Sequence, residues 1–285
     1  MQGSFLTQIA LPMVLALIMF GMGLSLTRDD FSRLLRMPSS VFAGLAGQVI
    51  LLPLLAFGIV VALDLPPYLA VGIMVLAACP GGTTSNLISH IARANLALSI
   101  TLTAITTLIC VLTTPFIIQF SLEYFGVENT DFSLLNTTLS LIAISLVPVL
   151  LGLWVRHKAP VFAQRQEAFF RRLAMVFMII MIAGISYQER EMLVKSFPDV
   201  FVLTISLNLL ATLLGVFIAK LVMLSKRDAV TLGIEIGTQN ASMAILITLT
   251  FLDDSRYAIA CGVYGVTMYL GAMALVAWNK IPERT

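Results

Sequence analysis

Long apolar runs separated by short polar stretches dominate this chain. Nine of the runs approach or exceed the roughly 20 residues that a helix needs to cross the hydrocarbon core of a bilayer. Their approximate bounds are 5–26, 41–63, 67–92, 97–122, 134–155, 173–187, 198–224, 229–251 and 257–279. The pattern predicts an all-α polytopic membrane protein with nine transmembrane helices. The shortest run, 173–187, can extend backwards through Phe169 and Phe170.

The composition agrees with a membrane protein. Apolar residues make up 59% of the 285 residues and charged residues only 11%, which leaves too few charges to cover a soluble domain of this size. The 17 basic and 15 acidic residues nearly cancel, so the charge balance gives no reason to expect a nucleic acid partner. No feature implies an obligatory protein partner. Because no basic residue precedes the first run, we expect this run to remain in the mature protein.

The basic residues indicate an orientation, because cytoplasmic loops of membrane proteins carry an excess of Lys and Arg. With the N-terminus outside and the C-terminus in the cytoplasm, only Arg190, Lys195 and Arg256 fall on the outer side. The others fall on the inner side, and they are Arg28, Arg33, Arg36, Arg93, Arg156, Lys158, Arg165, Arg171, Arg172, Lys220, Lys226, Arg227, Lys280 and Arg284. We therefore expect residues 1–285 to form one transmembrane unit in a bacterial inner (plasma) membrane.

Two of the predicted helices are interrupted near their middles. The stretch 79–82 (Cys-Pro-Gly-Gly) divides the run 67–92, and the stretch 237–240 (Gly-Thr-Gln-Asn) divides the run 229–251. Proline removes a backbone donor and glycine adds conformational freedom, so both stretches favour a break in the helix. Non-helical backbone at this depth is tolerated only where it is buried in protein or lines a cavity. The alternative is that the proline and the glycine merely kink their helices.

The positions of the two interrupted helices indicate an internal repeat. They lie five segments apart, so they cross the membrane in opposite directions, and each is followed by one last helix of its half. This is the arrangement of an inverted repeat, whose paired discontinuous helices form the ion and substrate site of secondary transporters. The two halves contain four and five helices, as if one helix were missing at the N-terminus. The sequence therefore favours a transporter.

One acidic residue lies deep inside a predicted helix. Glu235 is about seven residues into the run 229–251, where an ionised side chain costs roughly 3 kcal/mol on insertion scales. All other acids lie in loops or at segment ends, and no Lys or Arg falls in the middle of a segment. We therefore expect the balancing positive charge to come from solution, as a metal cation or a proton. A permanently protonated, structural glutamic acid is the alternative.

Several polar side chains of the predicted helices carry oxygen, the ligand atom that hard cations such as sodium prefer. They lie at the two breaks, on one face of 97–122 and alone in the middle of 41–63, and they are Ser85, Asn86, Ser99, Thr103, Gln48, Gln239 and Asn240. Each alone could instead form hydrogen bonds between or within helices, which is the commoner role of such residues in membranes. We expect that role for Asn208, Thr106 and Thr107. Around one carboxylate, the group as a whole favours sodium ligands.

Four sequence motifs resemble those of the bile acid:sodium symporter family. They are Ile-Met-Phe-Gly-Met-Gly-Leu at 18–24, Ala-Cys-Pro-Gly-Gly-Thr-Thr-Ser-Asn at 78–86, Ala-Arg-Ala-Asn-Leu-Ala-Leu-Ser at 92–99 and Glu-Ile-Gly-Thr-Gln-Asn at 235–240. The resemblance implies the nine-helix form of the family, with a panel domain, a core domain and two crossed, discontinuous helices. The panel would comprise about 5–26, 134–155 and 173–187, and the core about 41–122 and 198–279.

The resemblance also implies the site residues and the function. One sodium ion would be bound by Ser85, Asn86, Ser99, Thr103 and Glu235, and a second by Gln48, Glu235, Gln239 and the backbone carbonyls of Ile236 and Thr238. Thr83 and Asn240 would contact the substrate. The implied function is a symporter that imports an organic anion with two transported sodium ions by alternating access. The anion would be a small carboxylate such as pantoate or a keto acid, or a bile-acid-like anion. Some relatives carry a His-Asn pair where this chain has Met268-Tyr269-Leu270, which weakens the case for bile acids.

Two other functions compete with sodium symport. A proton-coupled organic anion transporter, with Glu235 as the proton carrier, is the main alternative, but it leaves the neighbouring hydroxyls and amides unexplained. An intramembrane hydrolase that uses Ser85 and His90 is the remote alternative. Five residues is an awkward spacing on a helix, and the sequence contains no hydrolase motif of the Gly-x-Ser-x-Gly or His-Glu-x-x-His type. We therefore do not expect an enzyme.

Overall fold

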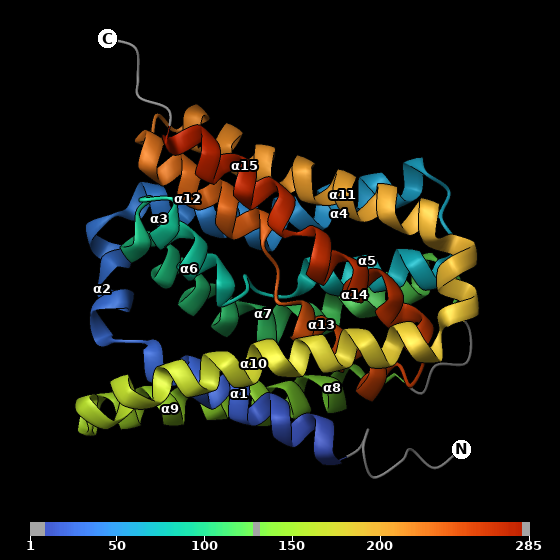
Figure 1. Ribbon diagram of the computed structural model, residues 1–285, viewed down its shortest axis with the longest axis horizontal. Helices are drawn as coiled ribbons and strands as arrows, with labels where there is room; N and C mark the ends of the chain where they lie inside the picture. Colours follow the sequence, from blue (N-terminus) through green and yellow to red (C-terminus); the bar gives the residue numbers. More distant parts are fainter. Residues whose placement is uncertain (1–8, 128–131, 281–285) are drawn as a thin grey trace.

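The computed structural model describes residues 9–127 and 132–280. The first residues of the predicted run 5–26 and the predicted inner-side residue Arg284 lie outside these ranges. Within the ranges the chain is built from helices and contains no strand, so the predicted all-α fold is confirmed. Most of the helices run along the long axis of the molecule, as Figure 1 shows.

The helices follow one another closely, and short π-helical or 3-10 turns join some of them. In chain order they are α1 (Leu11–Ser25), α2 (Arg28–Arg36), α3 (Pro38–Ala46), the π-helical turn Gly47–Leu51, α4 (Leu52–Ala62), α5 (Pro67–Ala78), α6 (Thr84–Ile91), α7 (Leu96–Tyr124), α8 (Leu134–Leu141), the π-helical turn Ile142–Leu146, α9 (Val147–Lys158), α10 (Pro160–Gln188), α11 (Arg190–Leu221), α12 (Lys226–Gly237), α13 (Ala241–Phe251), the 3-10 turn Ser255–Tyr257, α14 (Ala258–Thr267) and α15 (Tyr269–Lys280).

Several helical stretches are long and apolar enough to cross a membrane. In the described ranges there are six, or seven if α1 and α2 count as one span bent by 63°. The six are Pro38–Ala62, Leu96–Tyr124, Leu134–Lys158, Pro160–Gln188, Arg190–Leu221 and Ser255–Asn279. Two shorter apolar helices, α5 and α13, belong to the interrupted segments. The chain is thus an integral membrane protein made of helices, and the count of nine crossings stays a prediction.

Two helices extend well beyond the apolar runs that predicted them. α10 begins at Pro160 rather than near 173, and α11 begins at Arg190 rather than near 198. The added turns hold charged residues, because hydropathy reports only the part of a helix that lies at membrane depth. After α1 the chain also turns into α2, whose start carries a capping box of Thr27 and Asp30. The apolar runs alone assign that stretch to a loop.

α1, α8, α9 and α10 form a layer along one side of the molecule, at the bottom of Figure 1. α1 and α9 approach each other closely through two glycines, since a Cβ added to Gly23 would lie only 2.9 Å from the Cα of Gly152. Phe20 of α1 meets Phe170 of α10 edge to face, with ring centroids 5.6 Å apart. This layer contains the three segments that we predict as the panel.

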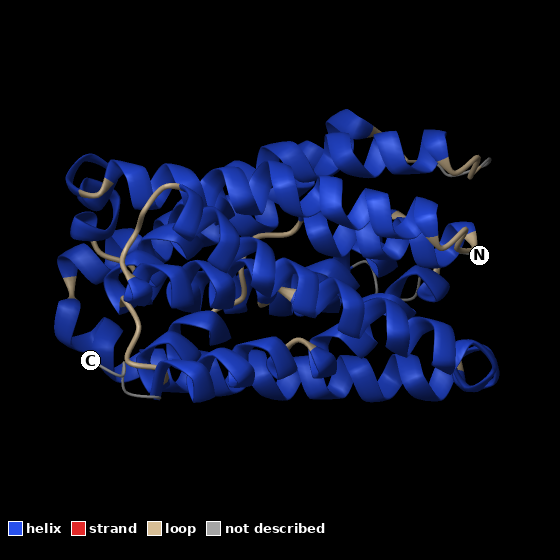
Figure 2. Cartoon of the chain, turned by 90° about the horizontal axis from the view of Figure 1, so that it is seen from above, coloured by secondary structure: helices blue, strands red, loops and turns tan. Residues whose placement is uncertain are grey.

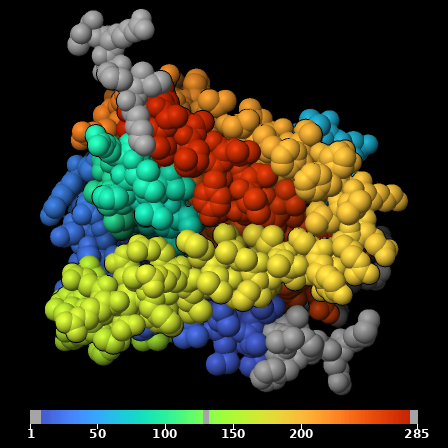
Figure 3. Space-filling model, viewed as in Figure 1, coloured from blue at the N-terminus to red at the C-terminus, as the bar shows by residue number. Residues whose placement is uncertain are grey.

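The interrupted segments lie in the interior of the molecule. Figure 1 places α3, α4, α11, α12 and α15 along the opposite side, with α5, α6, α7, α13 and α14 between the two sides. In the space-filling view, α10 lies against the surface formed by α6 and the last helices (Figure 3). Large apolar side chains are exposed on the outer faces, among them Leu151, Trp154, Ile180, Leu213 and Phe217. Such faces suit lipid, while the breaks are kept away from it.

Candidate functional site

The two breaks predicted from the sequence meet in the structure. α5 ends at Ala78 and α6 begins at Thr84, while α12 ends at Gly237 and α13 begins at Ala241. The amide of Gly82 donates to the carbonyl of Thr238 at 2.9 Å, and the amide of Asn240 donates to the carbonyl of Pro80 at 3.0 Å. Gly81 and Gln239 form an antiparallel bridge between them. Figure 2 shows loop backbone, in tan, among the helices of the bundle.

Two glycines leave room for close contacts where the two breaks meet. A Cβ added to Gly81 would fall 2.5 Å from Oε1 of Glu235, and one added to Gly82 would fall 2.9 Å from the carbonyl oxygen of Gln239. Side chains from several helices satisfy the backbone carbonyls that the breaks release. These bonds run from Thr114 to Ala78 O (2.6 Å), from Gln48 to Cys79 O (3.1 Å), and from Asn208 and Tyr264 to Gly237 O (2.9 Å each). Each of these three carbonyls therefore has a side-chain donor in place of a helical one.

Glu235 lies beside this crossing with 1% of its surface exposed. Its Oε2 accepts hydrogen bonds from Ser85 at 2.6 Å and from Ser99 at 2.9 Å. Thr103 donates to Oε1, and the Ser99 hydroxyl also lies 2.8 Å from Oδ1 of Asn86. The structure thus brings together all five residues predicted for the first sodium ion.

In the part of the chain that the structure describes, residues 9–127 and 132–280, the carboxylate of Glu235 forms no ion pair. The same residues contain no group of three or more His, Cys, Asp and Glu side chains that could hold a metal ion. One carboxylate among hydroxyl and amide oxygens is a donor set for a hard cation, not for a transition metal that prefers nitrogen and sulfur.

The residues predicted for a second ion form an adjoining group. Gln48 lies in a π-helical turn, a distortion that is frequent at functional sites. Its Nε2 donates to Oε1 of Gln239 at 2.7 Å, and Nε2 of Gln239 donates to the carbonyl of Ile236 at 2.7 Å. The hydroxyl of Thr238 is buried without a hydrogen-bond partner. A cation bound here would replace the hydrogen bonds of Gln48 and Gln239 and would be coordinated by their side-chain oxygens.

A cavity of about 430 Å³ reaches the crossing from one end of the bundle. It is lined on one side by α1, α2, α9 and α10 and on the other by α6 and α7, and it exposes Thr83 and Asn86. A smaller pocket of about 50 Å³ holds Thr83 and Asn240 together. Oδ1 of Asn240 accepts from the amide of Met243 at 3.1 Å, which leaves its amide nitrogen for a ligand. The two predicted substrate contacts are thus neighbours.

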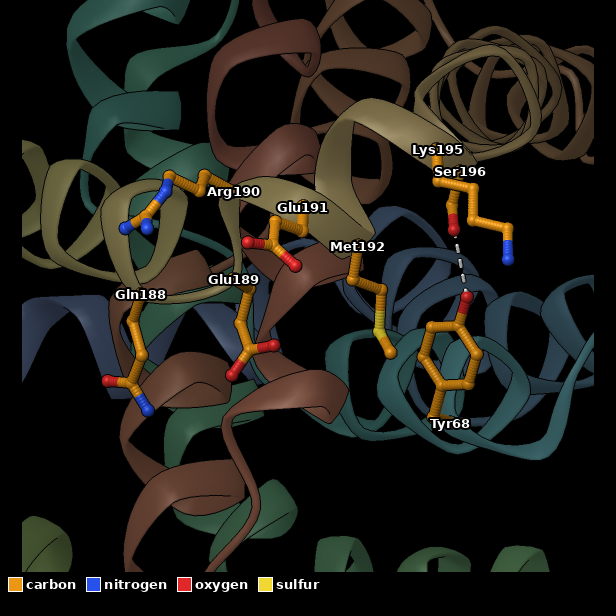
Figure 4. A pocket seen from close by; sticks show the side chains of 8 residues that line it. All are labelled: Tyr68, Gln188, Glu189, Arg190, Glu191, Met192, Lys195 and Ser196. Carbon is orange, nitrogen blue, oxygen red and sulfur yellow. Dashed lines mark hydrogen bonds between the residues drawn. The ribbon is translucent and has the colours of Figure 1, made fainter.

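A second large space lies at the junction of α10 and α11. Its volume is about 690 Å³, and Figure 4 shows the eight side chains that line it. Tyr68 and Ser196 are joined by a hydrogen bond of 3.0 Å, and nearby Gln188 donates to Ser255 at 2.9 Å. None of the predicted site residues lines this space. Its charged residues of both signs form the surface of the helix junction and do not converge on one point.

The structure also separates the residues of the proposed hydrolytic pair. The Ser85 hydroxyl donates to Glu235, while His90 lines the 430 Å³ cavity near the end of α6. The expected supporting roles of three other polar residues are confirmed. Thr106 and Thr107 donate to carbonyls of their own helix, and Asn208 bonds to the backbone of Gly237 and Met268.

Sequence reasoning missed Arg156 and Arg171 as residues of the cavity. The charge pattern assigns both only to the inner side, yet both line the cavity that also contains Thr83. The helical spacing of α10 could have indicated Arg171. Arg171, Ala174 and Met178 lie three and four residues apart, so they share one face of the helix, and all three line the small pocket. Hydropathy could not reveal it, since this face changes from charged to apolar along the helix.

A sequence model of the sodium bile acid symporter family matches residues 12–196. The chain belongs to this family. An uncharacterized sodium-dependent transporter of Bacillus subtilis (strain 168) is 33% identical over 273 residues, which cover 93% of this chain and 82% of that protein. A probable chloroplastic sodium/metabolite cotransporter of Arabidopsis thaliana is 28% identical over 268 residues, covering 93% of this chain and 66% of that protein. The ileal sodium/bile acid cotransporter of Oryctolagus cuniculus is 27% identical over 255 residues, covering 88% and 72% respectively.

Membership in the sodium bile acid symporter family bears on the rival functions. The family and these relatives indicate a sodium-dependent transporter of organic anions or bile acids, and they point away from an enzyme.

Proposed function

We propose that this member of the family imports a small organic carboxylate together with sodium ions by alternating access. The observation that carries the proposal is the environment of Glu235. Its carboxylate is buried among hydroxyl and amide oxygens, and no basic side chain in the described ranges forms an ion pair with it. A sodium ion would neutralise the carboxylate and use the surrounding oxygens as ligands.

The two neighbouring groups of oxygens support two sodium ions for each transported anion. Both groups would share Glu235, so two bound cations leave the site with a net positive charge. A carboxylate beside Thr83 would be attracted by this charge and by the free backbone amides at the start of α6. With a monoanion, each cycle would move one net charge inward and gain about 2.3 kcal/mol per 100 mV of membrane potential.

The cavity supports an inward-facing arrangement of the transporter. Its lining includes Arg33, Arg156 and Arg171, which the charge pattern assigns to the cytoplasmic side. At the opposite end, Gln188 of α10 is bound to Ser255 next to α14. Alternating access would require these outer contacts to open while the cavity closes, by movement of the predicted panel against the predicted core.

Sodium-dependent stability tests the proposal directly. A ligand that binds only the folded protein raises its stability, by about 1.4 kcal/mol at ten times its dissociation constant. We expect the purified protein to unfold a few degrees higher in sodium chloride than in potassium or choline chloride of equal ionic strength. Equal unfolding temperatures in the three salts, with a shift only on lowering the pH, would instead support proton coupling.

Gln48→Ala should weaken sodium binding without abolishing it. The substitution removes one side chain of the second group and leaves the five residues of the first group intact. In a thermal-shift titration with sodium chloride, we expect the half-saturating concentration to rise several-fold. Gln119→Ala on α7 is the matched control, because that amide bonds to Glu123 and lies away from the crossing. A Gln48→Ala titration identical to the control would exclude this side chain as a ligand.

A further inference from the structure

The 430 Å³ cavity carries more positive than negative charge on its walls. Its acidic residues are Asp30 and Glu167, and its arginines are Arg33, Arg156 and Arg171. Arg33 is paired with Asp30. Arg171 approaches Glu167 only to 3.8 Å, longer than a hydrogen bond. Nη1 of Arg156 is buried and has no hydrogen-bond partner. At least one guanidinium therefore faces the cavity without a fixed anion.

Arg171 occupies a particular place among these arginines. It lines both the large cavity and the small pocket that holds Thr83 and Asn240. Arg171 belongs to α10, whereas Thr83 and Asn240 belong to the two breaks. Arg171 therefore lines the pocket from the side opposite to the crossing. A guanidinium presents a planar set of donors that matches a carboxylate, which distinguishes arginine from lysine at such a position.

We propose that Arg171 is a substrate-binding residue that contacts the transported carboxylate from the α10 side, while Thr83 and Asn240 contact it from the crossing. Arg156 of α9, which lines the same cavity, attracts the anion into it. This inference rests on the proposed function and deepens it, because it makes the carboxylate group itself the feature that the protein selects. An uncharged analogue of the same shape would leave the guanidinium unpaired and bind poorly.

The alternative role for Arg171 is to mark the cytoplasmic side, as many arginines at helix ends do. The chain offers a matched control for this role. Arg172 is the next residue of α10, carries the same charge and lines neither the cavity nor the small pocket. Removing either charge has the same effect on the inner-side excess of basic residues, and only one of the two removals alters the cavity wall.

Thermal unfolding of the purified full chain in sodium chloride tests the inference, with the carboxylates pyruvate, pantoate and cholate as probes. The carboxylate that gives the largest shift is compared with its uncharged amide in the wild type and in Arg171→Gln, Arg171→Lys and Arg172→Gln. We expect Arg171→Gln to keep the shift caused by sodium, to raise the half-saturating carboxylate concentration at least tenfold, and to lose the preference for carboxylate over amide. Arg171→Lys should be intermediate, and Arg172→Gln should match the wild type.

Three outcomes would overturn the inference. They are wild-type carboxylate affinity in Arg171→Gln, equal losses in the Arg171→Gln and Arg172→Gln proteins, and the absence of a shift with any of the three probes in the wild type. The failure of the proposed function is a separate result, because it would appear as the absence of a sodium shift before any carboxylate is added.

Discussion

Glu235→Gln should abolish the stabilisation by sodium while leaving the protein folded. The substitution keeps the shape of the side chain and removes the charge that both predicted ions would share. The surrounding hydroxyls of Ser85, Ser99 and Thr103 can rotate to accept as well as donate. Because an unpaired buried charge is itself destabilising, we expect the variant in choline chloride to be at least as stable as the wild type. The measurement is the unfolding temperature in sodium, potassium and choline chloride.

Glu191→Gln is the control for this experiment. Glu191 lies in the exposed junction between α10 and α11, so loss of its charge should leave the sodium response unchanged. If Glu235→Gln retained the full response to sodium, the carboxylate would not be a ligand. If the variant lost a pH-dependent shift and the wild type showed no sodium response, Glu235 would be a proton carrier.

Gly81→Ala should have the second large effect, because it acts on the crossing itself. The added Cβ would meet the carboxylate of Glu235 and push it away from its hydroxyl partners. Overpacking of a closely packed interior costs typically 1–3 kcal/mol, so we expect a loss of roughly that size. We also expect the sodium response to disappear, since the displaced carboxylate can no longer face both groups of oxygens. Sodium-dependent unfolding and uptake into proteoliposomes measure the two effects.

Gly58→Ala controls for the change from glycine to alanine in general. Gly58 lies in α4, and a Cβ added there would meet nothing within 4 Å. Alanine is the better helix former, so the control should be as stable as the wild type or slightly more stable. A Gly81→Ala protein with the same stability and sodium response as the control would show that the crossing tolerates a larger residue.

The two breaks and the polar cluster around Glu235 could be predicted from the sequence because polar groups are conspicuous within apolar segments. Glu235 and Gln48 stand out inside apolar runs, and the Pro-Gly-Gly stretch at 80–82 signals a break by its backbone chemistry alone. Both breaks and the whole hydroxyl group around Glu235 are present in the structure. These features depend on local chemistry and on depth in the membrane, which a single sequence records.

Features that depend on which helices are neighbours could not be predicted from the sequence. Tyr264 reads as one more residue of an apolar helix, yet its hydroxyl holds the carbonyl of Gly237. Arg171 reads as an inner-side charge, yet it reaches the pocket at the crossing. The extension of α10 back to Pro160 was also missed, because its charged turns carry no hydropathy signal. Hydropathy gives the depth of a residue but not the direction in which its side chain points.

The backbone pairing of 80–82 with 238–240 joins the two broken segments into one mechanical element. The ligands of both predicted ions are attached to this element or lie directly against it, so neither group of oxygens can be reorganised without disturbing the other. Binding of the first cation would therefore include the free-energy cost of ordering this element, and binding of the second cation would not. Sodium binding should then be cooperative and depend sigmoidally on the sodium concentration. The form of the protein with a single bound sodium ion would be rare.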